Sequence, residues 1–377
     1  MLKCVRNEKE GIVIKRLGIF VFYDNEGIVD RYVEYLLMQM KRVLSELIIV
    51  VNGELKETSL EKVQKFSSEI IRRENKGYDG GAYKDVILDY VTRNRMDTYD
   101  ELVLFNDTFY GPFFPMEEIF SAFANERIDF WGLSRGVGLS CGEISVPDHV
   151  QAYFIVIKKD MLHRDDFWRF WKHLKYPTTH LEAILNYEIA FSTYFSELGY
   201  KYKTWIDIQC ADELLQPGIN IYLKYPCELI KNYRFPVLKR KAIYLKYIND
   251  IAQLFNWLEE HVSYDRSMVF EHLDRVKHAF SFIKIQRFAK LHKNIYIYGH
   301  GECGNAIKLY LETLNIQSKA FVVTRANPLG EQEISIEDLN LGAEDGIIVA
   351  LGEKNFSQVE RMLKEKFRWD QLLMPNY

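Results

Sequence analysis

The chain has 377 residues and a formal net charge of −4, with 48% apolar, 27% charged and 14% aromatic residues. A chain of this length folds as about two or three domains, and its composition is that of an ordinary globular protein. The acidic excess excludes a protein that binds nucleic acid over a broad basic surface. The five cysteines are scattered and form no Cys-x-x-Cys pair, so the sequence predicts neither a zinc site nor a disulfide framework.

Apolar strands alternate with helical patterns in the N-terminal half. Apolar segments at 17–23 and 47–51 flank a helical pattern at 29–45, which predicts a first β-α-β unit. Further strands are predicted at 101–105, 129–134, 151–157 and 200–206. This alternation predicts an α/β fold. The apolar runs are too short to span a bilayer, so we expect a cytoplasmic protein, with peripheral contact at the inner face of the membrane left open.

The pattern changes in the C-terminal third of the chain. Residues 247–292 carry apolar side chains at three- and four-residue spacing, which predicts helices. At Asn294 the alternation of strand and helix restarts. We therefore predict a large α/β domain at 1–245, a helical linker at 246–293 and a smaller Rossmann-like domain at 294–377.

The segment Phe-Asn-Asp-Thr follows the apolar strand at 101–105 and supplies a candidate metal site. Carboxylate oxygens are ligands that Mg²⁺ and Mn²⁺ prefer, and such an ion stabilises charge on a leaving nucleoside diphosphate. We predict Asp107 as the main metal ligand and Asn106 as a second residue of the metal site. On spacing alone, a helix cap or an Asx-turn is the commoner use of these two residues.

Other predicted strand ends carry residues suited to contact with a ligand. They are Tyr23, Asp24, Asn52, Arg73, Asn75 and Gly80. Ligands of open α/β sheets bind outside the carboxyl ends of the strands, so we expect these residues to converge on a nucleotide, although each alone is also ordinary turn chemistry. Lys239 and Arg240 suit the phosphates of a donor or a lipid, and a solvated basic loop explains them equally well.

A glycine-rich segment, Gly-His-Gly-Glu-Cys-Gly, lies between an apolar strand and a helix. Its glycines, Gly299, Gly301 and Gly304, have the context of a Rossmann phosphate loop. The next strand ends in Thr324-Arg325 and lacks the acidic residue that would bind a ribose diol, which disfavours NAD. An NAD(P)-dependent oxidoreductase stays open as an alternative function, as does a docking domain whose glycines only permit close packing.

An ordered series of motifs lies within residues 16–275: RRENKGYDGGAYKDV, YDELVLFNDTFYGPFFPMEEIF, DFWGLS, HVQAYFIVIKKDML, FWRFW, FPVLKRKAI and SYDRSMVFEHLDR. This series resembles the rhamnan synthesis protein F family of bacterial rhamnosyltransferases. The resemblance implies a GT-A type glycosyltransferase fold, a dTDP-L-rhamnose donor and a cell-surface polysaccharide acceptor on a lipid carrier. Asn106 stands where a stricter Asp-x-Asp motif would offer a first carboxylate, which puts tight dependence on Mg²⁺ or Mn²⁺ in doubt.

Inverting enzymes of that kind use an acidic residue to remove the proton from the attacking hydroxyl. We predict Glu188, in a helical pattern at 186–200, as this base, with Asp79 as the reserve. On pattern alone, a solvated helix residue is the commoner interpretation of Glu188. His149 precedes the strand at 151–157 and could approach the diphosphate or a metal, although a lone histidine there is more often a hydrogen-bonded or surface residue.

Three functions therefore follow from the sequence. The first is an inverting glycosyltransferase that acts on a nucleotide sugar and a lipid-linked saccharide, without nucleic acid as a partner. The second is an NAD(P)-dependent oxidoreductase built on the C-terminal glycine loop. The third is a non-catalytic scaffold of polysaccharide assembly, which the weak metal motif keeps open.

Overall fold

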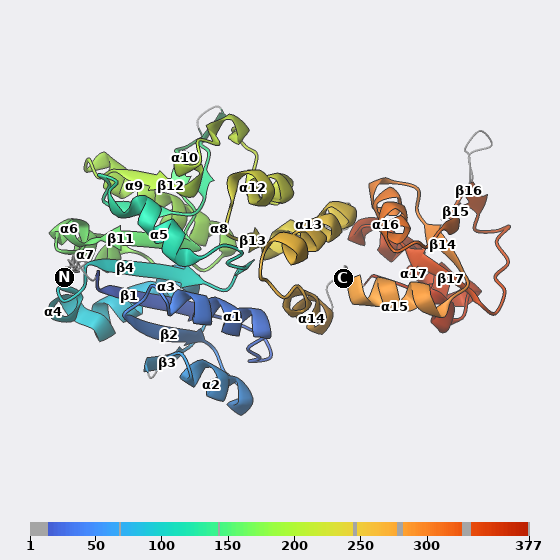
Figure 1. The fold of residues 1–377 in the computed structure, drawn as a ribbon, viewed down its shortest axis with the longest axis horizontal. Coiled ribbons are helices and arrows are strands. Elements are labelled where there is room, and N and C mark those ends of the chain that lie inside the picture. The colour runs from blue at the N-terminus through green and yellow to red at the C-terminus, as the bar shows by residue number, and fades with distance from the viewer. Residues whose placement is uncertain are drawn as a thin grey trace, which may run out of the picture. The chain divides into compact units, whose positions relative to one another are not determined.

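The computed structural model describes residues 14–67, 69–141, 144–243, 247–276, 282–325 and 333–375 (Figure 1). The chain divides into two compact units. The first unit comprises residues up to 29, 33–108 and 115–220, and the second comprises 30–32, 109–114 and 221–377. Within the described residues, no helix combines the length and the apolar character needed to cross a membrane.

A seven-stranded sheet forms the centre of the first unit, in the order β12-β6-β11-β4-β1-β2-β3. Its strands are β1 (Arg16–Phe22), β2 (Glu46–Asn52), β3 (Glu69–Arg73), β4 (Glu101–Asn106), β6 (Phe130–Gly132), β11 (Phe154–Lys158) and β12 (Tyr202–Thr204). The first four strands run parallel, whereas β11 runs antiparallel to both β4 and β6. The near-continuous apolar sequence of β1 follows from this arrangement, since a strand inside such a sheet is buried on both faces.

Helices cover both faces of this sheet (Figure 1). The longer ones are α1 (Arg31–Met40), α2 (Glu57–Gln64), α3 (Tyr78–Asp85), α5 (Met116–Ala124), α7 (Asp165–His173) and α9 (Ala190–Glu197). The chain makes a π-helical turn at Val86–Val91 (η1), directly after α3, and another at Ile184–Ile189 (η2), directly before α9. π-helical turns are rare in proteins, and those that occur are often found at functional sites.

The aromatic excess of the sequence fills the core of the first unit. On one face of the sheet, the ring of Phe191 lies 5.2 Å from that of Phe170 and 5.4 Å from that of Phe130. On the other face, Phe123 of α5 stacks on Trp131 of β6 at 4.0 Å. These rings are buried, so they contribute to folding through area burial and edge-to-face contacts.

The strand predicted at 200–206 is shorter in the structure and ends at Thr204. There the Thr204 and Asp207 side chains form a capping box that begins α10 (Trp205–Ile208). Because the Thr204 hydroxyl and the Asp207 carboxylate satisfy the free backbone N–H groups of a helix, the chain leaves the sheet at this point. Short two-stranded ladders were not expected from the sequence. They pair β5 (Phe109–Tyr110) with β13 (Leu238–Lys239), β7 (Arg135–Gly136) with β10 (His149–Val150), and β8 (Leu139–Cys141) with β9 (Ile144–Val146).

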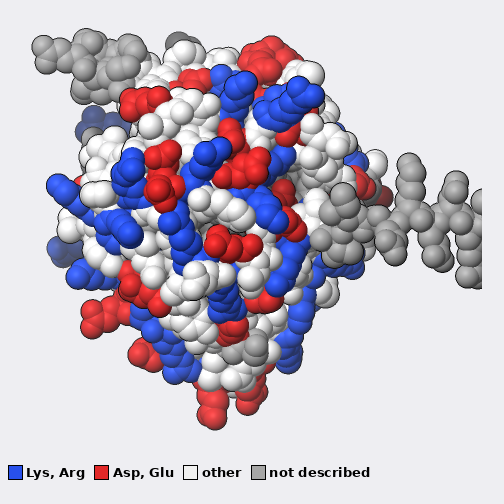
Figure 2. Space-filling model, turned by 90° about the vertical axis from the view of Figure 1, so that its left-hand side faces the viewer, with Lys and Arg blue, Asp and Glu red and all other residues white. Residues whose placement is uncertain are grey.

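One face of the first unit shows Lys and Arg interspersed with Asp and Glu (Figure 2). The helix α4 (Thr92–Met96) lies at this end of the unit. Its Arg95 contacts Glu46 at 3.1 Å and Glu69 at 2.6 Å. Among the coloured residues of this view, basic side chains are balanced by acidic neighbours and form no continuous field of one sign.

The second unit begins with helices and ends in a second sheet. Its helices are α11 (Ile221–Lys224), α12 (Pro226–Tyr233), α13 (Ile248–His261), α14 (Ser267–Arg275), α15 (Phe282–Leu291), α16 (Glu302–Thr313) and α17 (Glu353–Lys366). The predicted boundary at 245 differs from this division, because α12 packs on α13 and α13 packs on α16. The helices predicted as a linker are thus part of the same compact unit as the C-terminal sheet.

The second sheet has five parallel strands in the order β16-β15-β14-β17-β18. The strands are β14 (Asn294–Tyr298), β15 (Ser318–Val323), β16 (Glu333–Ser335), β17 (Asp345–Val349) and β18 (Leu372–Leu373). Numbered within this sheet, the order is 3-2-1-4-5, as in Rossmann-type folds. The predicted α/β fold class, with a second and smaller Rossmann-like sheet, is confirmed.

Candidate functional site

The carboxyl ends of β1, β2, β3 and β4 lie at one edge of the first sheet, because these strands are parallel. Val21 of β1 is in register with Asn106 of β4, and Asn52 of β2 is in register with Arg73 of β3. Strand ends therefore bring together residues that are up to 84 positions apart in the chain, from Tyr23 to Asp107. Open α/β sheets bind their ligands at this edge.

Asn106 links the end of β4 to the start of α3. Its Nδ2 donates to Asp79 Oδ2 at 2.6 Å, and its Oδ1 accepts from the backbone N–H of Thr108 at 3.1 Å and from the Thr108 hydroxyl at 2.8 Å. The bond to the Thr108 N–H is the Asx-turn that the sequence left open as the commoner use. Asn106 therefore orients the Asp79 carboxylate, an arrangement for which the sequence contains no local signal.

Three carboxylates act electrostatically on two buried tyrosines close to this edge. Burial raises the pKa of Tyr83 well above its ordinary value, and the charges of Asp79 and Asp107 raise it further. Burial likewise raises the pKa of Tyr187, with added contributions from Asp79 and Glu188. Asp79 acts on both phenols, and we call the three carboxylates that raise these two pKa values, Asp79, Asp107 and Glu188, the carboxylate cluster.

The two phenols add buried polar groups to this cluster. Neither the Tyr83 nor the Tyr187 hydroxyl has a hydrogen-bond partner among the described residues. The rings lie 6.0 Å apart, and Gly80 packs directly against one of them, since a Cβ at Gly80 would lie 2.8 Å from Tyr187 Cγ. Gly80 thus allows close packing of α3 on η2, and its predicted contact with a ligand stays a prediction.

Glu188 lies on η2, where both of its carboxylate oxygens face donors. Oε2 accepts from the backbone N–H of Ala152 at 2.8 Å, and Oε1 lies 3.6 Å from His149 Nε2. The side chain is 23% exposed, so it is neither fully buried nor freely solvated. The interpretation of Glu188 as a solvated helix residue does not fit these contacts.

Arg73 and Asn52 hold the loop that leads to Asp79. The Arg73 guanidinium donates to Asn52 Oδ1 at 2.6 Å, to Asp85 Oδ2 at 2.9 Å and to the Lys76 carbonyl at 2.7 Å. A guanidinium with three such partners is a rigid tie between β3, β2 and α3. Asn75 is exposed in the same loop. Direct contact of these residues with a nucleotide stays a prediction.

We expect Arg73→Ala to lower the free energy of unfolding by about 2–4 kcal/mol, because it leaves the Asp85 carboxylate without its charged partner. The matched control is Arg72→Ala, which removes an exposed arginine from the neighbouring position. Denaturant unfolding of both variants measures the difference. Equal stabilities would show that the Arg73 contacts contribute nothing to the fold.

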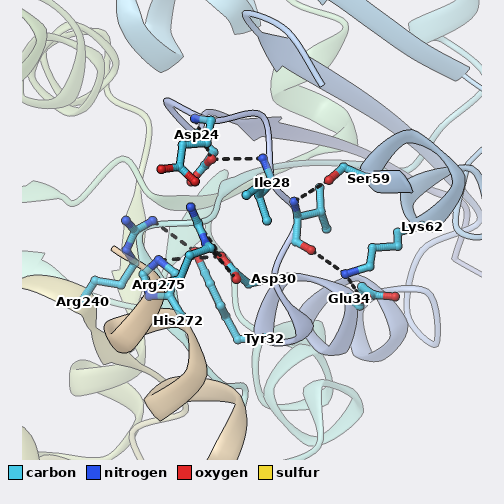
Figure 3. A network of polar contacts seen from close by, with 12 residues as sticks. Asp24, Ile28, Asp30, Tyr32, Glu34, Ser59, Lys62, Arg240, His272 and Arg275 are labelled. Carbon is cyan, nitrogen blue, oxygen red and sulfur yellow. Dashed lines mark hydrogen bonds and ion pairs between the residues drawn. The ribbon is translucent and has the colours of Figure 1, made fainter. Parts of the chain in front are cut away.

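Tyr23 and Asp24 have different roles after β1. Asp24 Oδ1 accepts from the backbone N–H groups of Glu26 and Ile28, both at 3.0 Å, which closes a turn (Figure 3). The ring of Tyr23 is 45% exposed and passes beside Gly53, whose Cβ position would lie 3.9 Å from the ring. Asp24 therefore has a structural role in the turn, whereas the partly exposed ring of Tyr23 is accessible for stacking against a ligand.

The predicted phosphate-binding residue Arg240 belongs to the second unit. It donates to the Tyr32 hydroxyl at 3.1 Å (Figure 3). In the same unit, Arg275 forms a fork with Asp30, with a shortest distance of 2.6 Å, and His272 Nδ1 lies 2.7 Å from the Tyr110 hydroxyl. Lys239 lies on β13, which pairs with β5. These contacts tie the segments 30–32 and 109–114 to the helices of the second unit, and phosphate binding by the two basic residues stays a prediction.

The C-terminal glycine loop connects β14 to α16, as the sequence predicts. Gly299 has a φ of +109°, which favours glycine, and a Cβ at Gly304 would lie 1.9 Å from the Gly299 carbonyl oxygen. No atom lies within 4 Å of the Cβ position of Gly301. Two of the three glycines are thus required by backbone geometry, whether or not a ligand binds.

An acidic residue that sequence reasoning missed lies beside this loop. Glu333 of β16 contacts His300 Nδ1 at 2.5 Å, and the His300 ring stacks on Phe321 at 4.0 Å. Glu333 is on the third strand of the sheet, whereas the fingerprint places its acidic residue at the end of the second. The strand order was needed to find it.

A metal ion at the carboxylate cluster would have few protein ligands. The part of the chain that the structure describes contains no group of three His, Cys, Asp or Glu side chains able to hold one. The amide oxygen of Asn106 already accepts from Thr108. Metal binding by Asp107 and Asn106 stays a prediction, and a bound Mg²⁺ would depend on substrate phosphates and water for most of its ligands.

Comparison with known proteins finds a family and one distant curated relative. The model of the family described as rhamnan synthesis protein F matches residues 47–303, which is more than half of the chain. An uncharacterized protein of Sinorhizobium fredii, y4gN, is 24% identical over 187 residues, covering 49% of this chain and 46% of the relative. The match thus spans less than half the length of that relative.

Among solved structures, similar chains include a CTP transferase, a mannosyltransferase and the protein TarS, all at TM-scores below 0.5. The inositol-1-phosphate CTP transferase of T. maritima is 14% identical, with a TM-score of 0.32 over 50% of this chain and 84% of that one. The mannosyltransferase Ktr4p of S. cerevisiae is 8% identical, with a TM-score of 0.30 over 52% and 69%. S. aureus TarS is 14% identical, with a TM-score of 0.27 over 59% and 73%.

Proposed function

Because the chain belongs to the rhamnan synthesis protein F family, we propose that it is a glycosyltransferase that moves a sugar from a nucleotide-sugar donor onto a bacterial cell-surface polysaccharide. The observation that supports this proposal most is the carboxylate cluster of Asp79, Asp107 and Glu188 beside the carboxyl edge of a parallel sheet. We propose dTDP-L-rhamnose as the donor, and a lipid-linked saccharide, reached by peripheral contact with the membrane, as the acceptor.

In the proposed reaction, Glu188 removes the proton from the attacking hydroxyl of the acceptor. The hydroxyl oxygen forms a bond to the anomeric carbon while the bond from that carbon to the diphosphate oxygen breaks. The electron pair of the broken bond leaves with the nucleoside diphosphate, and the anomeric configuration inverts. Asp79, held by Asn106, accepts a hydrogen bond from a sugar hydroxyl and is the reserve base.

The remaining residues of the edge bind and orient the donor. Tyr23 stacks on its base, and Arg73 and Asn52 hold the loop that carries Asp79. Asp107 would hold Mg²⁺ or Mn²⁺. When bound, such an ion supplies positive charge against the diphosphate, which lowers the cost of its departure.

Thermal unfolding of the purified protein with single nucleotides tests this proposal. The nucleotides are dTDP, UDP, GDP, NAD and NADP, each with and without Mn²⁺. A ligand that binds only the folded state, present at 100 times its Kd, stabilises that state by about 2.7 kcal/mol. We expect dTDP with Mn²⁺ to raise the melting temperature of the wild type and not that of Asp107→Ala.

Asp160→Ala is the matched control, because Asp160 is an exposed carboxylate at α6 (Lys159–Leu162). It is expected to respond to dTDP as the wild type does. Stabilisation by a dinucleotide alone would contradict the proposal and would make the C-terminal sheet, with its glycine loop, the functional centre. If dTDP with Mn²⁺ also raises the melting temperature of Asp107→Ala, donor binding does not depend on the Asp107 carboxylate.

A further inference from the structure

His149 is a buried histidine whose two ring nitrogens both face hydrogen-bond acceptors. Nδ1 lies 3.0 Å from the Pro147 carbonyl oxygen, and Nε2 lies 3.6 Å from Glu188 Oε1. A neutral imidazole carries one N–H and can satisfy only one acceptor as a donor, whereas the imidazolium carries two. The two acceptors therefore favour the charged ring, although only 7% of the residue is exposed.

The electrostatics agree with this geometry. Burial works against the charged ring, but the contact with the Glu188 carboxylate, the hydrogen bond to the Pro147 carbonyl and the charge of Asp148 outweigh it, so the pKa of His149 is raised. The other charged neighbour on these elements is Arg135 of β7, which is paired with Asp148 at 2.5 Å. Arg135 also contacts Asp207 at 3.0 Å and Asp212 at 3.4 Å, so Asp148 still acts on the ring, and Glu188 is the carboxylate for which a contact with the ring is seen.

The local fold is built to accommodate this ring. His149 is in register with Gly136 across the β7–β10 ladder, and a Cβ at Gly136 would lie 2.3 Å from His149 Nε2. The next residue, Val150, donates its backbone N–H to the Ser192 hydroxyl of α9 at 3.0 Å, which ties the ladder to the helix that follows Glu188. The β7–β10 ladder therefore fixes the ring of His149, and the bond from Val150 to Ser192 fixes this ladder relative to the helical segment that carries Glu188.

We propose that His149 is a positioning residue that holds Glu188 ionised and oriented for proton transfer. This inference rests on the function proposed above. One carboxylate oxygen is fixed by the Ala152 N–H and the other faces the imidazolium, so the carboxylate cannot rotate freely. A positive charge beside the carboxylate also disfavours its protonation before the acceptor arrives.

The ion pair has a defined dependence on pH. The pKa of His149 in the folded protein is raised above the value of about 6.5 for an unperturbed histidine. The contribution of the charged ring to stability is therefore fully present below that value. The contribution is lost as the pH rises through the raised pKa of the folded protein.

The first experiment measures the pair without any assay of transfer. The imidazole resonances of the wild type, Glu188→Gln and Glu197→Gln are followed by NMR over a pH titration, with His149→Asn identifying the resonance of His149. We expect the midpoint of His149 to fall by about one pH unit or more in Glu188→Gln. Glu197, an exposed residue at the end of α9, should leave it unchanged. An unshifted midpoint in Glu188→Gln would overturn the ion pair.

The second experiment measures the role of the pair in transfer. His149→Gln places a neutral donor near the position of Nε2, so it removes the charge while it keeps an N–H group on the side of Glu188. We expect kcat to fall about 10-fold to 100-fold with little change in KM for the donor, as for other groups that orient a reacting side chain. The acidic limb of the pH profile of kcat should move to higher pH, because Glu188 is then protonated more easily. A purely structural histidine would leave that limb in place.

The outcomes separate the two proposals. A wild-type kcat and an unchanged pH profile in His149→Gln would overturn the positioning role while leaving the transferase proposal intact. Absence of transfer by the wild type with every nucleotide sugar would overturn the proposed function and the role of His149 in it. The NMR titration would still establish or refute the ion pair in that case. If His149→Gln does not fold, kcat and the pH profile of His149→Asn measure the loss of the charge and of the contact with Glu188 together.

Discussion

Glu188→Gln is expected to lower kcat for sugar transfer by about 100-fold to 10,000-fold, the usual contribution of a general base. The amide is close in size to the carboxylate and can still accept from the Ala152 N–H, so the fold and the donor affinity should change little. Steady-state kinetics with the donor identified by thermal unfolding measure both quantities. The loss should appear in kcat, because the interaction is made with the reacting proton and not with the bound donor.

Two further variants make this experiment decisive. Glu197→Gln removes an exposed carboxylate from the same helical segment and should have the kinetics of the wild type. Asp79→Asn should cost less than Glu188→Gln if Asp79 binds a sugar hydroxyl and Glu188 is the base. The opposite order would assign the base to Asp79 and would reduce Glu188 to a structural partner of His149.

The second large effect is expected at Gly304, in the C-terminal glycine loop. A Cβ at this position would lie 1.9 Å from the Gly299 carbonyl oxygen, and both atoms belong to the backbone framework, so the loop must move. We expect Gly304→Ala to lower the free energy of unfolding by about 3 kcal/mol or more, since overpacking against rigid atoms costs 1–3 kcal/mol even where side chains can adjust.

Gly301→Ala is the control for this prediction, because no atom lies within 4 Å of its Cβ position. Denaturant unfolding gives the two free energies, and hydrogen exchange at 294–325 reports whether the loss is local. A destabilisation of equal size in both variants would contradict the packing explanation. It would also show that glycine is needed at position 301 for a reason other than the space around its Cβ position.

Strand positions and strand ends could be predicted from short stretches of the sequence. A strand inside a parallel sheet is buried on both faces, so segments such as 17–23 and 47–51 are continuously apolar and end abruptly at polar residues. The glycine loop at 299–304 could be recognised for a similar reason, since a tight strand-to-helix connection needs glycine at fixed positions. These signals are local because burial and backbone conformation act on each residue separately.

Some features had no local signal at all. The antiparallel direction of β11 depends on which strand it pairs with, and that choice is made by the whole sheet. The end of β12 at Thr204 was missed because a capping box competes with the strand pattern there, and tertiary position decides between them. The second unit likewise begins earlier than predicted, because helical periodicity does not reveal which domain a helix packs against.

The candidate residues of the site could thus be named from the sequence, whereas the side chains that they contact could not be predicted from it. Asp79, Asp107 and Glu188 stand out as acidic residues near strand ends and in a helix, because sheet edges and helix faces leave a pattern in the sequence. That Asn106 orients Asp79, that Glu188 faces His149, and that Glu333 approaches His300 are contacts between residues 27 to 39 positions apart. Such contacts arise only when strands and helices are brought into register, since hydrogen bonds and ion pairs act over a few ångströms of space whatever the separation along the chain.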